Sequence, residues 1–272
     1  MSIVTISAQM GSGGADIAHA LADRLGYQLI GSEQLAKVAI RHGLVPKRVA
    51  HFGGAKPSLV ERLSWETRLY LAVIQSAVYE FAEQDRAVIL GRGGQWLLRG
   101  VTHALRLRVI APYRLRVERM SAELTRYGQG AGLDAVREMV RRDDLDKAGR
   151  ARYLYESDLD EPDLYDLVLN TETVGVDAAV DPIAELVERP EMSATRESTQ
   201  VVADRGLASR VRIALAASAD TRRHRSEVEA RTGAVCLTGT AGLEAAARIA
   251  TLVPGVRAVE SRSLAVPFVP LG

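Results

Sequence analysis

The most constraining feature of the sequence is a glycine-rich loop set directly between a short apolar run and a helical pattern. The run is Ile3–Ser7, and the loop that follows reads Ala8-Gln9-Met10-Gly11-Ser12-Gly13-Gly14-Ala15-Asp16. Beyond it, Ile17, Leu21 and Leu25 recur every fourth residue, the spacing of one helix face. A strand, glycine loop and helix in this order direct backbone N–H groups at one point, which suits a phosphate. The alternative is a glycine-rich turn that binds nothing.

Residues 1–187 repeat this alternation of short apolar runs with helical stretches. Five ranges read as buried strands: Ile3–Ser7, Ala87–Leu90, Leu105–Ile110, Leu167–Asn170 and a weaker Tyr27–Ile30. A long amphipathic stretch covers Ser58 to about Gln84. Strands that alternate with helices predict an α/β fold, with a parallel sheet covered by helices on both faces.

The overall composition excludes several classes of protein. Lys and Arg number 35 and Asp and Glu 34, so the net charge of +1 gives no general attraction to nucleic acid or to an anionic membrane. The single cysteine, Cys236, excludes an intrachain disulfide and is expected as a small buried strand residue. No apolar run is long enough to cross a bilayer, and residues Met1–Ile6 lack the pattern of a signal peptide, so we expect a cytoplasmic protein.

The glycine loop departs from the usual phosphate-loop motif G-x-x-x-x-G-K-[ST]. Three of the four signature residues are missing, and Gly14 stands where the lysine would be. Without that ammonium group, the phosphate charge must be neutralised by cations from elsewhere in the chain.

Cations that could serve this purpose follow later strands. Arg92 lies in Gly91-Arg92-Gly93-Gly94, directly after Ala87–Leu90, at the sheet edge where α/β proteins bind ligands. Arg116 and Arg119 lie one helical turn apart after the next strand. The stretch Arg137–Tyr155 carries Lys147, Arg150 and Arg152, read either as a lid that closes over phosphates or as a solvated helix face.

The composition changes after residue 187. Residues 188–203 are polar and read as a linker, and a second pattern of helix, strand, strand, helix and strand runs from about Val201 to Leu264. The group Arg222, Arg223, His224 and Arg225 reads as a solvated loop or as a contact for anionic lipid or nucleic acid.

Five ordered blocks of the first part resemble the cytidylate kinase-like family, a divergent branch of nucleoside monophosphate kinases. The blocks are Gly11-Ser12-Gly13-Gly14, Val88-Ile89-Leu90-Gly91-Arg92-Gly93, Arg106 to Pro112, Asp146-Lys147-x-x-Arg150-Ala151-x-Tyr153-Leu154, and Asp163 to Thr171. The resemblance implies a five-stranded parallel sheet of the P-loop kinase type over residues 1–187.

The same resemblance implies a function and a set of site residues. ATP, as phosphoryl donor, would be held by Gly11, Ser12, Gly13, Gly14, Ala15 and Asp16, and Asp16 would act indirectly on Mg²⁺. Arg92, Lys147, Arg150 and Arg152 would act on the acceptor, CMP, dCMP or a related nucleotide, and on the transferred group. The alternative is a nucleotide-binding regulatory protein with weak or no turnover.

Residues 204–266 are similar to a BON domain, a small α+β module with the order αββαβ. The residues that carry this likeness are Gly233-Ala234-Val235-Cys236-Leu237-Thr238-Gly239, Ala246 to Ala250, and Val253-Pro254-Gly255-Val256. It implies a protein or membrane-surface partner, through which the regulatory alternative would signal. We expect no specific binding of nucleic acid, and the sequence leaves the oligomeric state open.

Overall fold

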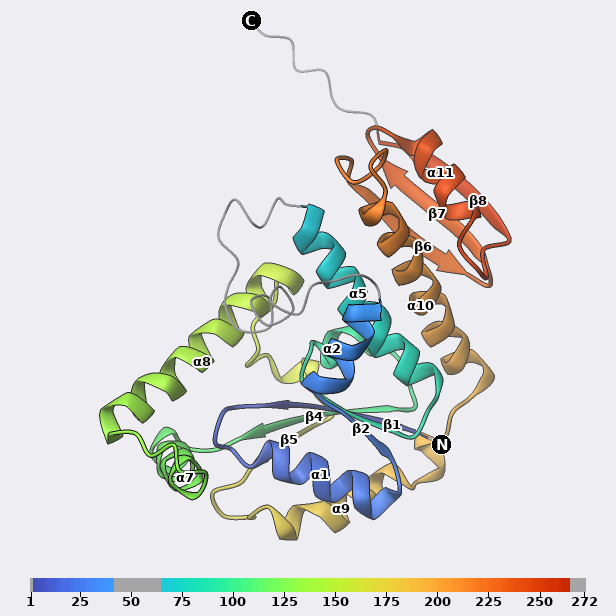
Figure 1. Ribbon diagram of the computed structural model, residues 1–272. Helices are drawn as coiled ribbons and strands as arrows, with labels where there is room; N and C mark the ends of the chain where they lie inside the picture. The colour runs from blue at the N-terminus through green and yellow to red at the C-terminus, as the bar shows by residue number, and fades with distance from the viewer. Residues whose placement is uncertain (1, 42–64, 265–272) are drawn as a thin grey trace, which may run out of the picture. The chain divides into compact units, whose positions relative to one another are not determined.

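A computed structural model of the chain describes residues 2–41 and 65–264. Contacts within it define two compact units. The first unit takes its described residues from 2–36 and 84–198, and the second takes them from 37–41, 65–83 and 199–264. Each unit has its own sheet (Figure 1).

The first unit contains a five-stranded parallel sheet in the order β2-β3-β1-β4-β5. Its strands are β1 (Ile3–Ala8), β2 (Gln28–Ile30), β3 (Ala87–Leu90), β4 (Ala104–Ile110) and β5 (Leu167–Asn170). Its helices are α1 (Gly14–Leu25), α6 (Gly94–Leu97), α7 (Tyr113–Arg126), α8 (Leu133–Tyr155), α9 (Asp177–Val187) and the 3-10 turns η1 (Pro162–Leu164) and η2 (Pro190–Met192). Helix α2 (Ser32–Arg41) begins in this unit and ends in the second.

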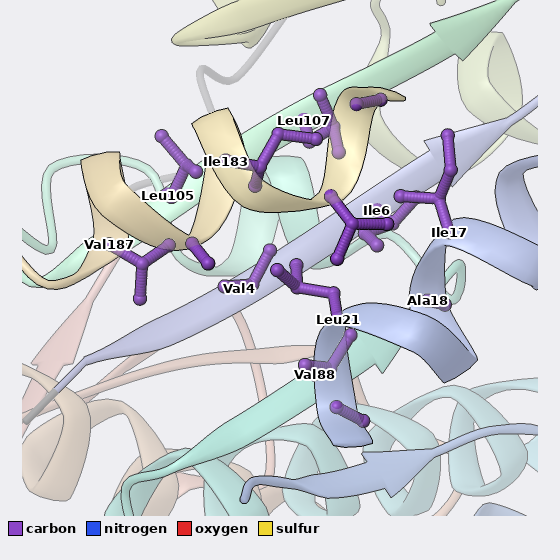
Figure 2. Close-up of a cluster of buried hydrophobic side chains, with 14 of the residues drawn as sticks. Val4, Ile6, Ile17, Ala18, Leu21, Val88, Leu105, Leu107, Ile183 and Val187 are labelled. Carbon is purple, nitrogen blue, oxygen red and sulfur yellow. The ribbon is translucent and has the colours of Figure 1, made fainter. Parts of the chain in front are cut away.

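Alternation along the strands separates the two faces of the sheet. Val4 and Ile6 of β1 point to one face, where they meet Leu21 of α1 and Ile183 of α9 in a buried apolar cluster (Figure 2). On the other face, α6 packs so closely on β1 that a Cβ added at Gly94 would lie 1.9 Å from the hydroxyl oxygen of Thr5. The prediction of a parallel sheet with helices on both faces is therefore confirmed.

The predicted strands agree with the observed ones to within a residue or two at each end. Helix α1 begins at Gly14 rather than near Asp16. Of the predicted amphipathic stretch, residues 58–64 lie outside the described ranges, and the rest forms α5 (Trp65–Glu83) in the second unit.

The second unit follows the predicted order of helix, strand, strand, helix and strand. These elements are α10 (Arg196–Ala217), β6 (Ser226–Arg231), β7 (Ala234–Gly239), α11 (Leu243–Thr251) and β8 (Ala258–Ser263). β7 pairs antiparallel with β6 and parallel with β8. An apolar core joins the two helices to one face of this sheet through side chains such as Val211, Leu237 and Ala250. Assignment of this unit to the BON family stays a prediction.

Two local features differ from the sequence expectations. Helix α10 begins at Arg196, within the range predicted as a linker, because Thr195 and Ser198 cap it reciprocally: each backbone N–H donates to the other's hydroxyl, at 3.0 and 3.1 Å. Cys236 is half-buried rather than buried, since it alternates with the buried Val235 and Leu237 and faces away from the core. None of the described helices is both long and apolar enough to span a membrane.

Candidate functional site

The glycine loop lies between β1 and α1 and contains two glycines in the left-handed region. Gly11 and Gly13 have φ angles of +75° and +80°, a region that side chains disfavour. Gly13 is the N-cap residue of α1 and no side chain caps the helix, so its first N–H groups remain for another acceptor. The hydroxyl of Ser12 is also buried, and no residue in the described ranges hydrogen-bonds to it.

Packing within the loop explains why Gly14 replaces the usual lysine. A Cβ at position 14 would lie 2.3 Å from Cβ of Ala8 and 3.3 Å from Cβ of Val109. A side chain of any kind at this position forces the loop away from β1. The shape of the loop therefore explains the missing lysine. Comparison of the sequence with the motif does not reveal this reason.

Helix α8 brings an ammonium group to the loop instead. Nζ of Lys147 donates to the carbonyl oxygen of Ala8 at 2.9 Å and lies 2.7 Å from a carboxylate oxygen of Asp143. Ala8 is the last residue of β1, immediately before the loop. Lys147 thus lies at the loop although 139 residues of sequence separate it from Ala8.

Two arginines of α7 hold the loop in place, one directly and the other through Thr171. Arg116, whose side chain is 5% exposed, donates to the carbonyl oxygen of Met10 and forms a two-pronged pair with Asp144 of α8 at 3.0 and 2.8 Å. Arg119 donates to the hydroxyl and carbonyl oxygens of Thr171, and the Thr171 hydroxyl donates to the carbonyl of Ser12. The sequence predicted that these arginines share a helix face, but not that Arg116 binds the Met10 carbonyl or that Arg119 is linked to the Ser12 carbonyl through Thr171.

We expect Arg116→Gln to lower the free energy of unfolding by about 3 kcal/mol. The substitution leaves the partly buried carboxylate of Asp144 and the carbonyls of Met10 and Ala111 without their donor. Chemical denaturation followed by circular dichroism measures the change. Arg114→Gln is the control: this residue lies on the same helix with its side chain 92% exposed, and its pair with Glu118 should contribute less than about 1 kcal/mol. Equal losses in the two variants would contradict an anchoring role for Arg116.

Arg92 lies in a tight turn at the end of β3. Its φ angle is +61°, between two glycines at +76° and +79°, and its guanidinium donates to the hydroxyl of Ser32 at 2.8 Å. A Cβ at Gly93 would lie 2.3 Å from the hydroxyl oxygen of Tyr155, and the ring of Tyr155 stacks on Trp96 with centroids 4.2 Å apart. The end of α8 therefore packs directly on the turn that carries Arg92.

The two arginines predicted in the lid, Arg150 and Arg152, both lie in the last two turns of α8. Arg150 is three residues beyond Lys147 on α8, so the two share a helix face. Arg152 is exposed and donates to Asp158 at 2.8 Å, and this bond lowers the pKa of the Asp158 carboxyl. The structure thus joins Arg152 to the segment after α8, whereas Lys147 contacts the loop.

Asp16 lies exposed in the first turn of α1. Within residues 2–41 and 65–264, no group of three or more His, Cys, Asp or Glu side chains could hold a metal ion. Mg²⁺ usually keeps several water ligands and binds through one or two carboxylates together with substrate phosphates. One carboxylate in the first turn of α1 fits that mode of binding, and a site built from protein ligands alone does not.

Comparisons with known proteins identify the family and the fold of the first part of the chain. The profile of the cytidylate kinase-like family matches residues 3–173. A cytidylate kinase from Archaeoglobus fulgidus is 25% identical over 188 residues, 68% of this chain and 94% of that protein. Another from Methanoregula boonei is 26% identical over 176 residues, 64% of this chain and 87% of that protein. An uncharacterized protein from Eubacterium ventriosum of known structure shares the fold, with a TM-score of 0.53, 19% identity and coverage of 70% of this chain and 100% of that one.

Proposed function

The chain belongs to the cytidylate kinase-like family, and from this we propose that it transfers the γ-phosphoryl group of ATP to a nucleoside monophosphate, CMP or dCMP. An oxygen of the acceptor phosphate attacks the γ-phosphorus, the bond from that phosphorus to the β–γ bridging oxygen breaks, and ADP and a nucleoside diphosphate leave. Such a reaction needs positioning and charge stabilisation rather than a nucleophilic side chain.

The observation that carries this proposal is the placement of the Lys147 ammonium at the glycine loop. In the proposed site, the backbone N–H groups from Gly11 to Asp16 hold the ATP phosphates, and Lys147 supplies the charge that position 14 cannot carry. Asp16 would hold Mg²⁺ indirectly, and a bound Mg²⁺ would supply positive charge against the phosphates. Arg92 binds the acceptor phosphate, and Arg150 and Arg152 close over the group in transfer.

Formation of ADP in the presence of each nucleoside monophosphate tests the proposal. We expect turnover that is fastest, by kcat/KM, with CMP or dCMP. If no monophosphate yields ADP, the kinase proposal is wrong. Tight binding of ATP without ADP formation would instead support the regulatory alternative, in which the unit formed by α10 to β8 passes a nucleotide signal to a protein or a membrane surface.

We expect Arg150→Ala to lower kcat about 100-fold while the dissociation constant of ATP changes by less than about threefold. Arg150 is assigned to the phosphoryl group in transfer, so its contribution should be made in the transition state. Single-turnover kinetics and equilibrium binding of ATP separate the two quantities. Arg142→Ala, on the same helix with its side chain 76% exposed, should change neither. Equal losses of kcat and of ATP affinity would remove this role from Arg150.

A further inference from the structure

Strand β4 carries a buried guanidinium group that the proposed mechanism does not use. Leu107 and Val109 point into the apolar core shared with α1 and α9, so Arg108 between them points to the opposite face of the sheet. Its side chain is 6% exposed. A charge buried to this degree is costly unless ionic and hydrogen-bonding partners surround it.

The partners of Arg108 satisfy it incompletely. One terminal nitrogen donates to the hydroxyl of Ser7 at 2.9 Å, and the other donates to a carboxylate oxygen of Asp160 at 3.2 Å. The guanidinium carbon lies 5.8 Å from the ring centre of Tyr165. The remaining nitrogen, Nε, is buried and has no hydrogen-bond partner among the described residues.

Arg106, two positions away on β4, is a useful comparison because its guanidinium is fully paired. Arg106 lies on the same face of β4, and its Nε and a terminal nitrogen grip both carboxylate oxygens of Asp166 at 3.1 and 2.7 Å. Arg108 has one bond to one carboxylate oxygen. Within the described ranges, Asp160 is its only ion-pair partner, and that side chain is 80% exposed.

The surroundings of Arg108 lie beside the loop and the turn of the proposed site. Ser7 directly precedes Ala8, whose carbonyl binds Lys147, and the amide of Gly91 donates to the carbonyl of Ile6 at 2.8 Å. Gln95, in the helix that follows Arg92, is 3% exposed and hydrogen-bonds to Tyr165. Arg108 pairs with Ser7 at the end of β1 that leads into the phosphate loop, and β1 in turn pairs with β3, whose end leads into the Arg92 turn.

We propose that Arg108 is a second binding residue for the phosphate of the acceptor nucleotide, and that the carboxylate of Asp160 occupies its place until the acceptor binds. The inference rests on the proposed function, because it assigns an acceptor to the same site. The acceptor phosphate must lie next to the loop to attack ATP, whereas its base need not. A phosphate offers several oxygens to the planar guanidinium, including to Nε, and Asp160 offers one.

The exposed position of Asp160 makes this exchange inexpensive. Asp160 lies between α8 and β5, in the segment 156–161, and its carboxylate returns to water when it leaves Arg108. The phosphate replaces one anionic partner of the buried guanidinium with another, so Arg108 stays paired during the exchange. The carboxylate then acts as an internal competitor that weakens acceptor binding without blocking it.

Calorimetric titration of the full chain with CMP, UMP, AMP and GMP, in the absence of ATP, tests the proposal. We expect Asp160→Asn to tighten binding of the preferred monophosphate about three- to tenfold. Asp163→Asn, an exposed carboxylate of the same region, should change it by less than about twofold. Binding of the matching nucleoside, which lacks the phosphate, should be equal in wild type and Asp160→Asn. Arg108→Lys should weaken monophosphate binding about tenfold, because lysine cannot reproduce the two-pronged contact.

Each outcome decides the proposal. It is wrong if Asp160→Asn leaves monophosphate affinity unchanged or lowers it, if the nucleoside tightens equally, or if no monophosphate binds either protein. The readout is binding, so it is independent of turnover. A chain that forms no ADP but binds monophosphate more tightly as Asp160→Asn would refute the kinase proposal and retain this one. If Arg108→Lys fails to fold, the substitution at the exposed Asp160 still decides the question.

Discussion

Lys147→Met is expected to lower kcat for phosphoryl transfer by about 100- to 1,000-fold, the cost of removing a cation that stabilises charge on a phosphoryl group in transfer. The steric limit at Gly14 excludes a side chain there, and Lys147 is the residue whose ammonium contacts the carbonyl that precedes the loop. Methionine keeps an unbranched apolar side chain and removes the ammonium group, with its charge and its hydrogen bond to Ala8. Steady-state kinetics with ATP and the preferred monophosphate measure the effect.

Two further variants test whether the loss of kcat in Lys147→Met comes from the charge at this position rather than from any loss of charge on α8. Arg142→Met removes a cation from an exposed position of the same helix and should leave kcat within about twofold of wild type. Asp143→Asn removes the partner that holds the ammonium 2.7 Å away, and should lower kcat less than Lys147→Met does. A Lys147→Met protein with kcat within about fivefold of wild type would show that the loop does not depend on this cation.

Gly11→Ala is expected to cost about 3 kcal/mol of stability and to weaken ATP binding at least about tenfold, because two penalties combine. The φ angle of +75° strains any residue with a side chain. In addition, the new Cβ would lie 2.5 Å from the carbonyl oxygen of Arg116, a backbone atom that cannot turn aside. Chemical denaturation and equilibrium binding of ATP measure the two effects.

Gly100→Ala isolates the first of these penalties. Gly100 has a φ angle of +77°, and no atom of residues 2–41 and 65–264 lies within 4 Å of a Cβ added there. We expect a loss of about 1–2 kcal/mol and unchanged ATP affinity, since only the left-handed strain remains. If Gly11→Ala lowers the free energy of unfolding no more than Gly100→Ala does, the close contact between the loop and α7 contributes nothing to stability.

The parallel sheet could be predicted because each of its strands is a short apolar run bounded by turn residues. Such runs need no knowledge of distant partners, and β1, β3 and β5 all follow this rule. The start of α10 was missed because its cap consists of a single Thr and Ser pair inside an otherwise polar stretch. The placement of α5 with the second unit depends on contacts such as the Glu83–Arg210 pair, which join residues 127 apart in sequence.

The type of site could be predicted from the sequence, but the contacts between its residues could not. The missing lysine at position 14 indicated that cations from elsewhere could replace it, and Lys147 was one of the candidates in the stretch 137–155. Which loop atom it meets depends on the approach of two elements separated by more than a hundred residues. The roles of Thr171 and Arg108 could not be predicted for the same reason: a threonine after a strand, or an arginine within one, reads as an ordinary surface residue until the fold brings its partner near.

A crystal structure of the protein with Mg²⁺ and a non-hydrolysable ATP analogue tests the central claim most directly. We expect phosphate oxygens within about 2.7–3.2 Å of the backbone nitrogens from Gly13 to Asp16 and of Nζ of Lys147. A nucleotide bound elsewhere on the chain, or one held at the loop with Lys147 still on the Ala8 carbonyl and away from every phosphate, would contradict the claim.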